Sequence, residues 1–125
     1  MNENEIISKA ELSEMLHELK VAVNEGTVSE KNKNVFPRIL YWPYVEEDVV
    51  ASGEGYQNLS TYQVSFFARA PQHDKYKELR KKLRKKGLHP KFYHEYIEND
   101  ALFEKTWHTY FSIDVLEEIE EEQDE

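Results

Sequence analysis

Apolar residues recur at intervals of three and four along the first part of the chain. This spacing places them on one side of a helix. Ser8 followed by Glu11 forms a capping-box pattern ahead of them, and Gly26 is a natural stop. We therefore expect a helix from about Lys9 to Glu25, then a polar surface connection over residues 27–34. The apolar stripe of this helix consists of Leu12, Met15, Leu16, Leu19, Ala22 and Val23.

Four later segments carry strand patterns. Residues 36–44 are rich in aromatic and branched side chains, and the two prolines of the segment lie near its ends, which predicts a first strand. Residues 61–70 alternate between apolar and polar positions until Pro71, which predicts a second strand. A third strand is expected from about Lys91 to Ile97 and a fourth from about Thr106 to Leu116. The apolar faces of the second and fourth strands are expected to be Tyr62, Val64, Phe66 and Ala68, and Trp107, Thr109, Phe111, Ile113 and Val115.

The segment between the first two strands holds three consecutive acids, Glu46, Glu47 and Asp48, and two glycines ahead of Tyr56. It is too long for a tight hairpin turn, so we expect a long loop. Long loops on small domains are often functional. This loop is a candidate contact with another subunit or a partner.

A second helix is expected over residues 75–86, with Asp74 as a possible cap and Gly87 as the end. Tyr76, Leu79 and Leu83 would form its narrow apolar stripe. Eight of the sixteen Lys and Arg residues of the chain lie in this helix. Three interpretations stay open for them: a solvated face, a contact with a subunit or partner, and a nucleic-acid surface.

The order of elements predicts an α+β fold. We expect a four-stranded, mainly antiparallel sheet with both helices on one face, in the order α-β-β-α-β-β. Residues 1–116 would form a single domain. Residues 117–125 include seven acids and would form a disordered tail.

Composition and net charge disfavour several classes of function. The chain has 125 residues, no cysteine and a net charge of −9, which disfavours general affinity for nucleic acid. No apolar run approaches the about 18 residues of a membrane span, so we expect a soluble, unexported protein. His94 and His108 could meet across a hairpin, and a cross-strand polar pair is favoured there over a metal site. We expect no enzyme activity, no metal and no cofactor.

The chain from Phe36 to Leu116 resembles tail-completion or tail-terminator proteins of long-tailed phages and prophages of Gram-positive bacteria. The resemblance rests on an overall pattern, without an invariant catalytic signature. It implies an α+β subunit that closes into a ring, with six subunits, at the head-proximal end of the tail. The segments that carry it are FPRILYWPY, VVASGEGYQNLSTYQVSFFARAPQ, LRKKGLHPKFYHEYIEND and WHTYFSIDVLE.

The leading hypothesis is therefore a structural, non-enzymatic tail-terminator subunit. Its partners would be further copies of itself, the tail-tube protein and the head connector, without a membrane or specific nucleic acid. It would act in the host cytoplasm during assembly and then at the head–tail junction of the virion. The alternatives are a nucleic-acid-binding or regulatory module using residues 75–86, and a head-completion protein. The expected interface residues are Glu46, Glu47, Asp48, Tyr56, Lys81, Lys82, Lys85 and Lys86.

Overall fold

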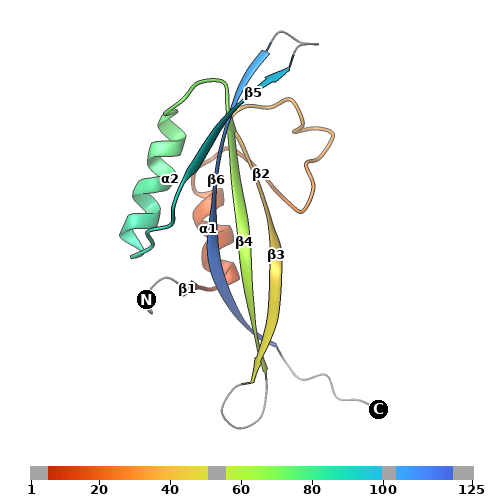
Figure 1. Ribbon diagram of the computed structural model, residues 1–125, viewed down its shortest axis with the longest axis vertical. Coiled ribbons are helices and arrows are strands. Elements are labelled where there is room, and N and C mark those ends of the chain that lie inside the picture. The colour runs from red at the N-terminus through yellow and green to blue at the C-terminus, as the bar shows by residue number, and fades with distance from the viewer. Residues whose placement is uncertain (1–5, 51–55, 100–103, 120–125) are drawn as a thin grey trace.

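A single curled, mixed sheet and two helices make up the computed structural model, which describes residues 6–50, 56–99 and 104–119 (Figure 1). The strand order is β1-β6-β4-β3-β2, and β5 also pairs with β6. Both helices pack against the same face of the sheet. The elements are β1 (Ile6–Ile7), α1 (Lys9–His17), β2 (Ala22–Glu25), β3 (Arg38–Val50), β4 (Tyr56–Ala68), α2 (Asp74–Lys85), β5 (Tyr93–Asn99) and β6 (Glu104–Ile119).

The predicted four-stranded, mainly antiparallel sheet is wrong, because the sheet of the described residues has six strands and is mixed. The four expected strands correspond to β3, β4, β5 and β6, which pair antiparallel. Two short strands extend them: β1 pairs parallel with β6, and β2 pairs parallel with β3. A strand of two residues is too short for alternation to be visible in a sequence.

The first helix is shorter than predicted. Its capping box is confirmed: Glu11 N–H donates to the Ser8 hydroxyl at 3.1 Å, and Ser8 N–H donates to the Glu11 carboxylate at 3.2 Å. Leu19 is still buried in the core. Lys20, however, has a φ of 58°, which lies in the left-handed region and turns the chain away from the helical path. The chain then enters β2, so the predicted helical residues 22–25 are a strand.

The predicted long loop after the first strand is also wrong. β3 and β4 continue as a ladder of antiparallel pairs from Val45 opposite Thr61 to Val50 opposite Tyr56. A register shift between Pro43 and Val45 leaves Tyr44 as the extra residue of a bulge. The three acids therefore lie on a strand. The glycine-containing part of the expected loop, residues 51–55, lies outside the described residues.

The helix α2 forms nearly as expected. The cap, however, is His73, whose Nδ1 accepts a hydrogen bond from Lys75 N–H at 3.0 Å. At the other end Gly87 takes a φ of 78°, and Leu88 N–H donates to the Leu83 carbonyl at 2.9 Å. This arrangement closes a helix with a left-handed residue followed by a buried apolar one. The predicted stripe of Tyr76, Leu79 and Leu83 is confirmed as buried.

The core lies between the helices and one face of the sheet. The expected apolar faces of the second and fourth strands are confirmed, with Trp107 half-buried at the end. β6 continues past Leu116 to Ile119, so it includes the first residues of the expected acidic tail, whose residues 120–125 lie outside the described part. The buried apolar residues are Ile7, Leu12, Met15, Leu16, Leu19, Ile39, Tyr41, Tyr62, Val64, Phe66, Ala68, Tyr76, Leu79, Leu83, Leu88, Phe111, Ile113 and Val115.

Replacing Leu79 with alanine tests this packing. Leu79 is fully buried between α2 and the sheet, so its truncation leaves a cavity and lowers the free energy of unfolding by about 2–5 kcal/mol. Val49→Ala is the control, because Val49 is on the exposed part of β3, and its effect should stay within about 0.5 kcal/mol. Urea denaturation of both variants measures the difference, and equal effects would contradict this core.

Candidate interaction surfaces

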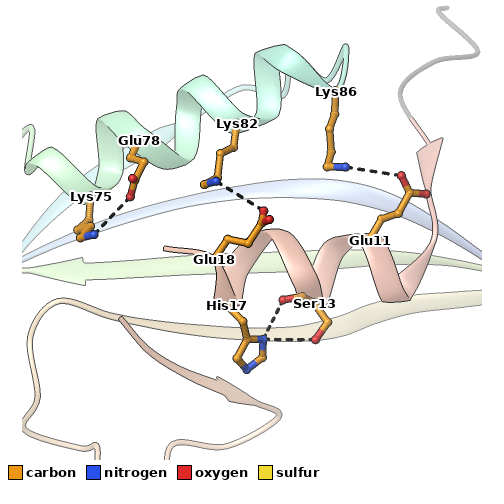
Figure 2. A network of polar contacts seen from close by, with 8 residues as sticks. All are labelled: Glu11, Ser13, His17, Glu18, Lys75, Glu78, Lys82 and Lys86. Atoms are coloured by element: carbon orange, nitrogen blue, oxygen red, sulfur yellow. Dashed lines mark hydrogen bonds and ion pairs between the residues drawn. The ribbon is translucent and has the colours of Figure 1, made fainter. Parts of the chain in front are cut away.

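The lysines of α2 form two sets. Those of the first set make ion pairs with carboxylates of α1. Lys82 Nζ lies 3.5 Å from a Glu18 carboxylate oxygen, and Lys86 Nζ lies 3.7 Å from one of Glu11. Figure 2 shows both ion pairs spanning the space between α2 and α1. Lys82 and Lys86 were expected at an interface between subunits. Within the chain they join α1 to the C-terminal half of α2, and their expected interface role stays a prediction.

Glu11 makes polar contacts with both helices. One of its carboxylate oxygens accepts the hydrogen bond from Ser8 N–H at the start of α1, and the other faces Lys86, the C-cap residue of α2. The Ser8 backbone hydrogen bond, with smaller contributions from the Ser8 side chain and Lys86, lowers the pKa of Glu11 below its usual value. The carboxylate remains exposed to solvent, so each of these ion pairs adds at most about 1 kcal/mol.

The second set of cations forms an exposed row, which we name the basic stripe. Its members recur at helical spacing and point away from the buried face of α2 and from the ion pairs with α1. They are exposed, and within the described part of the chain they have no ion-pair partner. The basic stripe consists of Lys77, Lys81, Arg84 and Lys85, so it includes two of the four lysines expected at an interface.

The expected acidic interface residues lie on β3. All three are exposed, and no cation within the described residues pairs with them. Glu46 is opposite Ser60 and Asp48 is opposite Asn58. Both project from the sheet face against which the helices pack, beyond the part of β3 that the helices cover. Glu47 projects from the other face, between Val45 and Val49. We name Glu46–Asp48 the acidic edge.

The acidic edge is a free strand edge. β2 pairs with β3 only from Arg38 to Tyr41, so beyond Tyr41 no described strand lies on that side of β3. Tyr56, the remaining expected interface residue, begins β4 opposite Val50, and its side chain lies outside the described part.

The basic stripe and the acidic edge lie on opposite sides of the molecule. α2 packs toward β5, with Tyr76 5.7 Å from Phe92 and 5.5 Å from His94 between ring centroids. β3 lies on the other side of β4 and β6 in the strand order. Figure 1 shows α2 beside one edge of the sheet and β3 along the other. The two surfaces therefore do not neutralise each other within one subunit.

The sheet face without helices carries a row of stacked aromatic and cationic side chains, which the sequence analysis missed. The His108 ring stacks between Phe67 at 4.6 Å and Tyr110 at 4.9 Å. Tyr110 also stacks on Tyr93 of β5 at 5.3 Å, and the Arg38 guanidinium lies 4.6 Å from the Phe67 centroid. The only signal in the sequence was the occurrence of these residues at the outward positions of each strand.

A serine, a histidine and a glutamate follow one another in this row, as in a hydrolase triad. His108 Nε2 lies 2.8 Å from the Ser65 hydroxyl, and its Nδ1 lies 2.8 Å from a Glu95 carboxylate oxygen. A nucleophile must reach its substrate, but Ser65 has 0% of its surface exposed. The three residues therefore satisfy one another's polar groups and hold the sheet face together.

The expected meeting of His94 and His108 does not occur. The register pairs His94 with Thr109 and Glu95 with His108, so the two imidazoles project from opposite faces. His94 Nδ1 instead lies 2.9 Å from the Thr109 hydroxyl. Within residues 6–50, 56–99 and 104–119, no three His, Asp or Glu side chains gather into a group that would hold a metal ion.

Large apolar side chains gather on the face that the helices leave open. Five of the seven large hydrophobic residues that are exposed in the described part lie there. Tyr44 reaches across β4 to Ser112 of β6 with a 3.0 Å hydrogen bond between the hydroxyls. This face therefore carries most of the large apolar side chains that are exposed in the described part of the chain. The five residues are Tyr44, Val45, Val49, Tyr93 and Ile97.

Neither the scan against protein-family models nor the search of curated proteins finds a match for this chain. Among the described residues, neither helix has the length and apolar character needed to cross a membrane.

Glu11→Gln tests the link between α1 and α2. The pKa of Glu11 is lowered in the folded chain, so its stabilising contribution is present above its usual value of 4.5 and is lost as the pH falls through the folded pKa. We expect the variant to be less stable than the natural chain at pH 7 by about 0.3–1 kcal/mol. The difference should vanish in acid, where both side chains are neutral.

Urea denaturation across the acid range measures this difference. Glu14→Gln is the matched control, because Glu14 lies on the same helix and is exposed without an ion pair in the described residues. A Glu11→Gln effect that stays constant with pH would show that its charge does not matter.

Proposed function

We propose that this chain is a structural, non-enzymatic subunit of a phage tail-terminator ring. The supporting observation is the helix-free sheet face, on which most of the exposed large apolar residues gather. Exposed apolar surfaces of this kind mark sites of protein contact, and the cores of homo-oligomer interfaces are more apolar than the rest of the surface.

The resemblance to tail-terminator proteins supports the same function. It covers residues 36–116, which span β3, β4, α2, β5 and nearly all of β6. The helix-free face, the basic stripe and the acidic edge all lie within this part of the chain. A subunit with different contact surfaces on its two sides associates head to tail, and such contacts make rings when the rotation closes.

In this function the ring ends the tail tube and presents a docking surface to the head connector. The resemblance implies six subunits. Assembly would take place in the host cytoplasm, and the finished ring would lie at the head–tail junction. A head-completion protein would use a similar ring with the connector alone as its partner.

A nucleic-acid-binding module is the rival from a different class. The four exposed cations of the basic stripe favour it, since each can neutralise a phosphate. Two observations oppose it: the net charge is −9, and Lys82 and Lys86 are already neutralised by α1.

A tube-capping experiment tests the proposed function. The chain is added in increasing amounts to a phage tail-tube protein while that protein polymerises. We expect shorter tubes with a ring at one end in negative-stain electron micrographs, because a bound ring blocks further addition. Val45→Asp/Val49→Asp, which places charges on exposed positions of the helix-free face, should weaken this effect.

Lys31→Glu/Lys33→Glu is the control, because it places charges on the exposed connection before β3. Tube lengths that do not change with any amount of the chain would overturn the tail-terminator function. If the chain instead joins only the connector protein, the head-completion alternative holds. Retention on duplex DNA that falls steeply with salt, in a chain that stays monomeric, would favour the nucleic-acid module.

A further inference from the structure

We infer that the basic stripe of one subunit docks on the acidic edge of a second copy of this chain. This inference rests on the proposed function, because it names the contact through which the ring would close. It follows from the charges that have no ion-pair partner among residues 6–50, 56–99 and 104–119. Its partner is another identical chain.

The first step is the difference between the two sets of lysines on α2. The carboxylates of α1 are within reach of α2, yet they engage Lys82 and Lys86 and leave the basic stripe free. Lys77 and Lys81 are exposed, like Arg84 and Lys85, on a helix surface that no other described residue covers. Four like charges on one helix face repel one another. An anionic partner surface would relieve that repulsion.

The second step is the spacing of the opposite charges. Lys81 and Lys85 are four residues apart on a helix, which separates them by about 6 Å along its axis. Glu46 and Asp48 are two residues apart on the same face of a strand, which separates them by about 7 Å. The two pairs can therefore meet side by side.

The third step is the placement of the two surfaces. The basic stripe lies on the β5 side of the sheet, and the acidic edge lies on the far side of β3. A two-fold dimer with both contacts would need the surfaces on one side. Opposite placement instead lets each subunit offer its stripe to one neighbour and its edge to the other. Such a contact is heterologous, and closing it satisfies every stripe and every edge.

Charge reversal tests the contact. The stripe variant is Lys81→Glu/Lys85→Glu, and the edge variant is Glu46→Lys/Asp48→Lys. All four positions are exposed, so both variants should fold, which circular dichroism and thermal unfolding check. Lys31→Glu/Lys33→Glu is the matched control, because it makes the same change in net charge as the stripe variant at exposed positions away from α2.

Sedimentation velocity at an ionic strength of about 50 mM, where screening is weak, measures assembly. The natural chain and the control should sediment as the same oligomer, and each reversed variant alone should bind its neighbours at least tenfold more weakly. An equimolar mixture of the two variants should assemble again, because every stripe then meets an edge of opposite charge. One chain carrying both reversals should also assemble.

Reversed variants that assemble like the natural chain would overturn the contact, as would a mixture that remains monomeric. A natural chain that stays monomeric at every soluble concentration, with and without tube protein, would overturn it too. A stripe variant that loses only DNA retention would assign the stripe to nucleic acid instead.

The tube-capping experiment separates this inference from the proposed function. If both reversed variants cap tubes as well as the natural chain, the function stands and the contact falls. If assembly follows the charge pattern while tube length is unchanged, the contact stands and the tail-terminator function falls.

Discussion

The packing of both helices against one face of the sheet determines how the other surfaces of the molecule are used. Leu12, Leu16, Leu79 and Leu83 cover the apolar positions of β3, β4 and β6, and this burial supplies the main stabilisation of a chain of this size. Within the described part of the chain, no helix packs against the second face of the sheet. This one-sided arrangement leaves polar and stacked side chains on that face and charges around the sheet.

The helix-free face is stabilised by a different means. Its aromatic rings stand beside one another across β4, β6 and β5, and the Arg38 guanidinium of β3 lies over the ring of Phe67. The His108 ring contributes stacking on both sides and hydrogen bonds at both nitrogens. Cross-strand pairs of this type are the unit of sheet stability. The row keeps the long strands in register where no helix supports them.

Much of the fold follows from local patterns in the sequence, where one surface of an element is clearly apolar. α2, β4 and β6 were predicted for this reason. In each of them the residues of the apolar pattern are the ones that are buried. β2 was missed because Ala22 and Val23 also fit a helical stripe, and the left-handed turn at Lys20 has no signature in that pattern. The β3–β4 hairpin was missed because strand residues exposed on both faces need not alternate.

The candidate site was less predictable than the fold. The sequence identified the basic helix and the three acids, but it grouped Lys82 and Lys86 with Lys81 and Lys85 as one interface. Their division depends on where α1 lies, which is a tertiary property. The stacked row could not be predicted from the sequence for a similar reason, since it depends on the register between β4, β6 and β5.

The free edge of β3 has one more consequence. An unpaired strand edge is a template on which another strand can add, and identical chains with such edges tend to grow into fibres. Two acidic edges placed together would bring Glu46, Glu47 and Asp48 against their own copies. The bulge at Tyr44 also interrupts a regular ladder just above them. The carboxylates thus protect the chain from joining edge to edge, which limits uncontrolled aggregation at high concentrations.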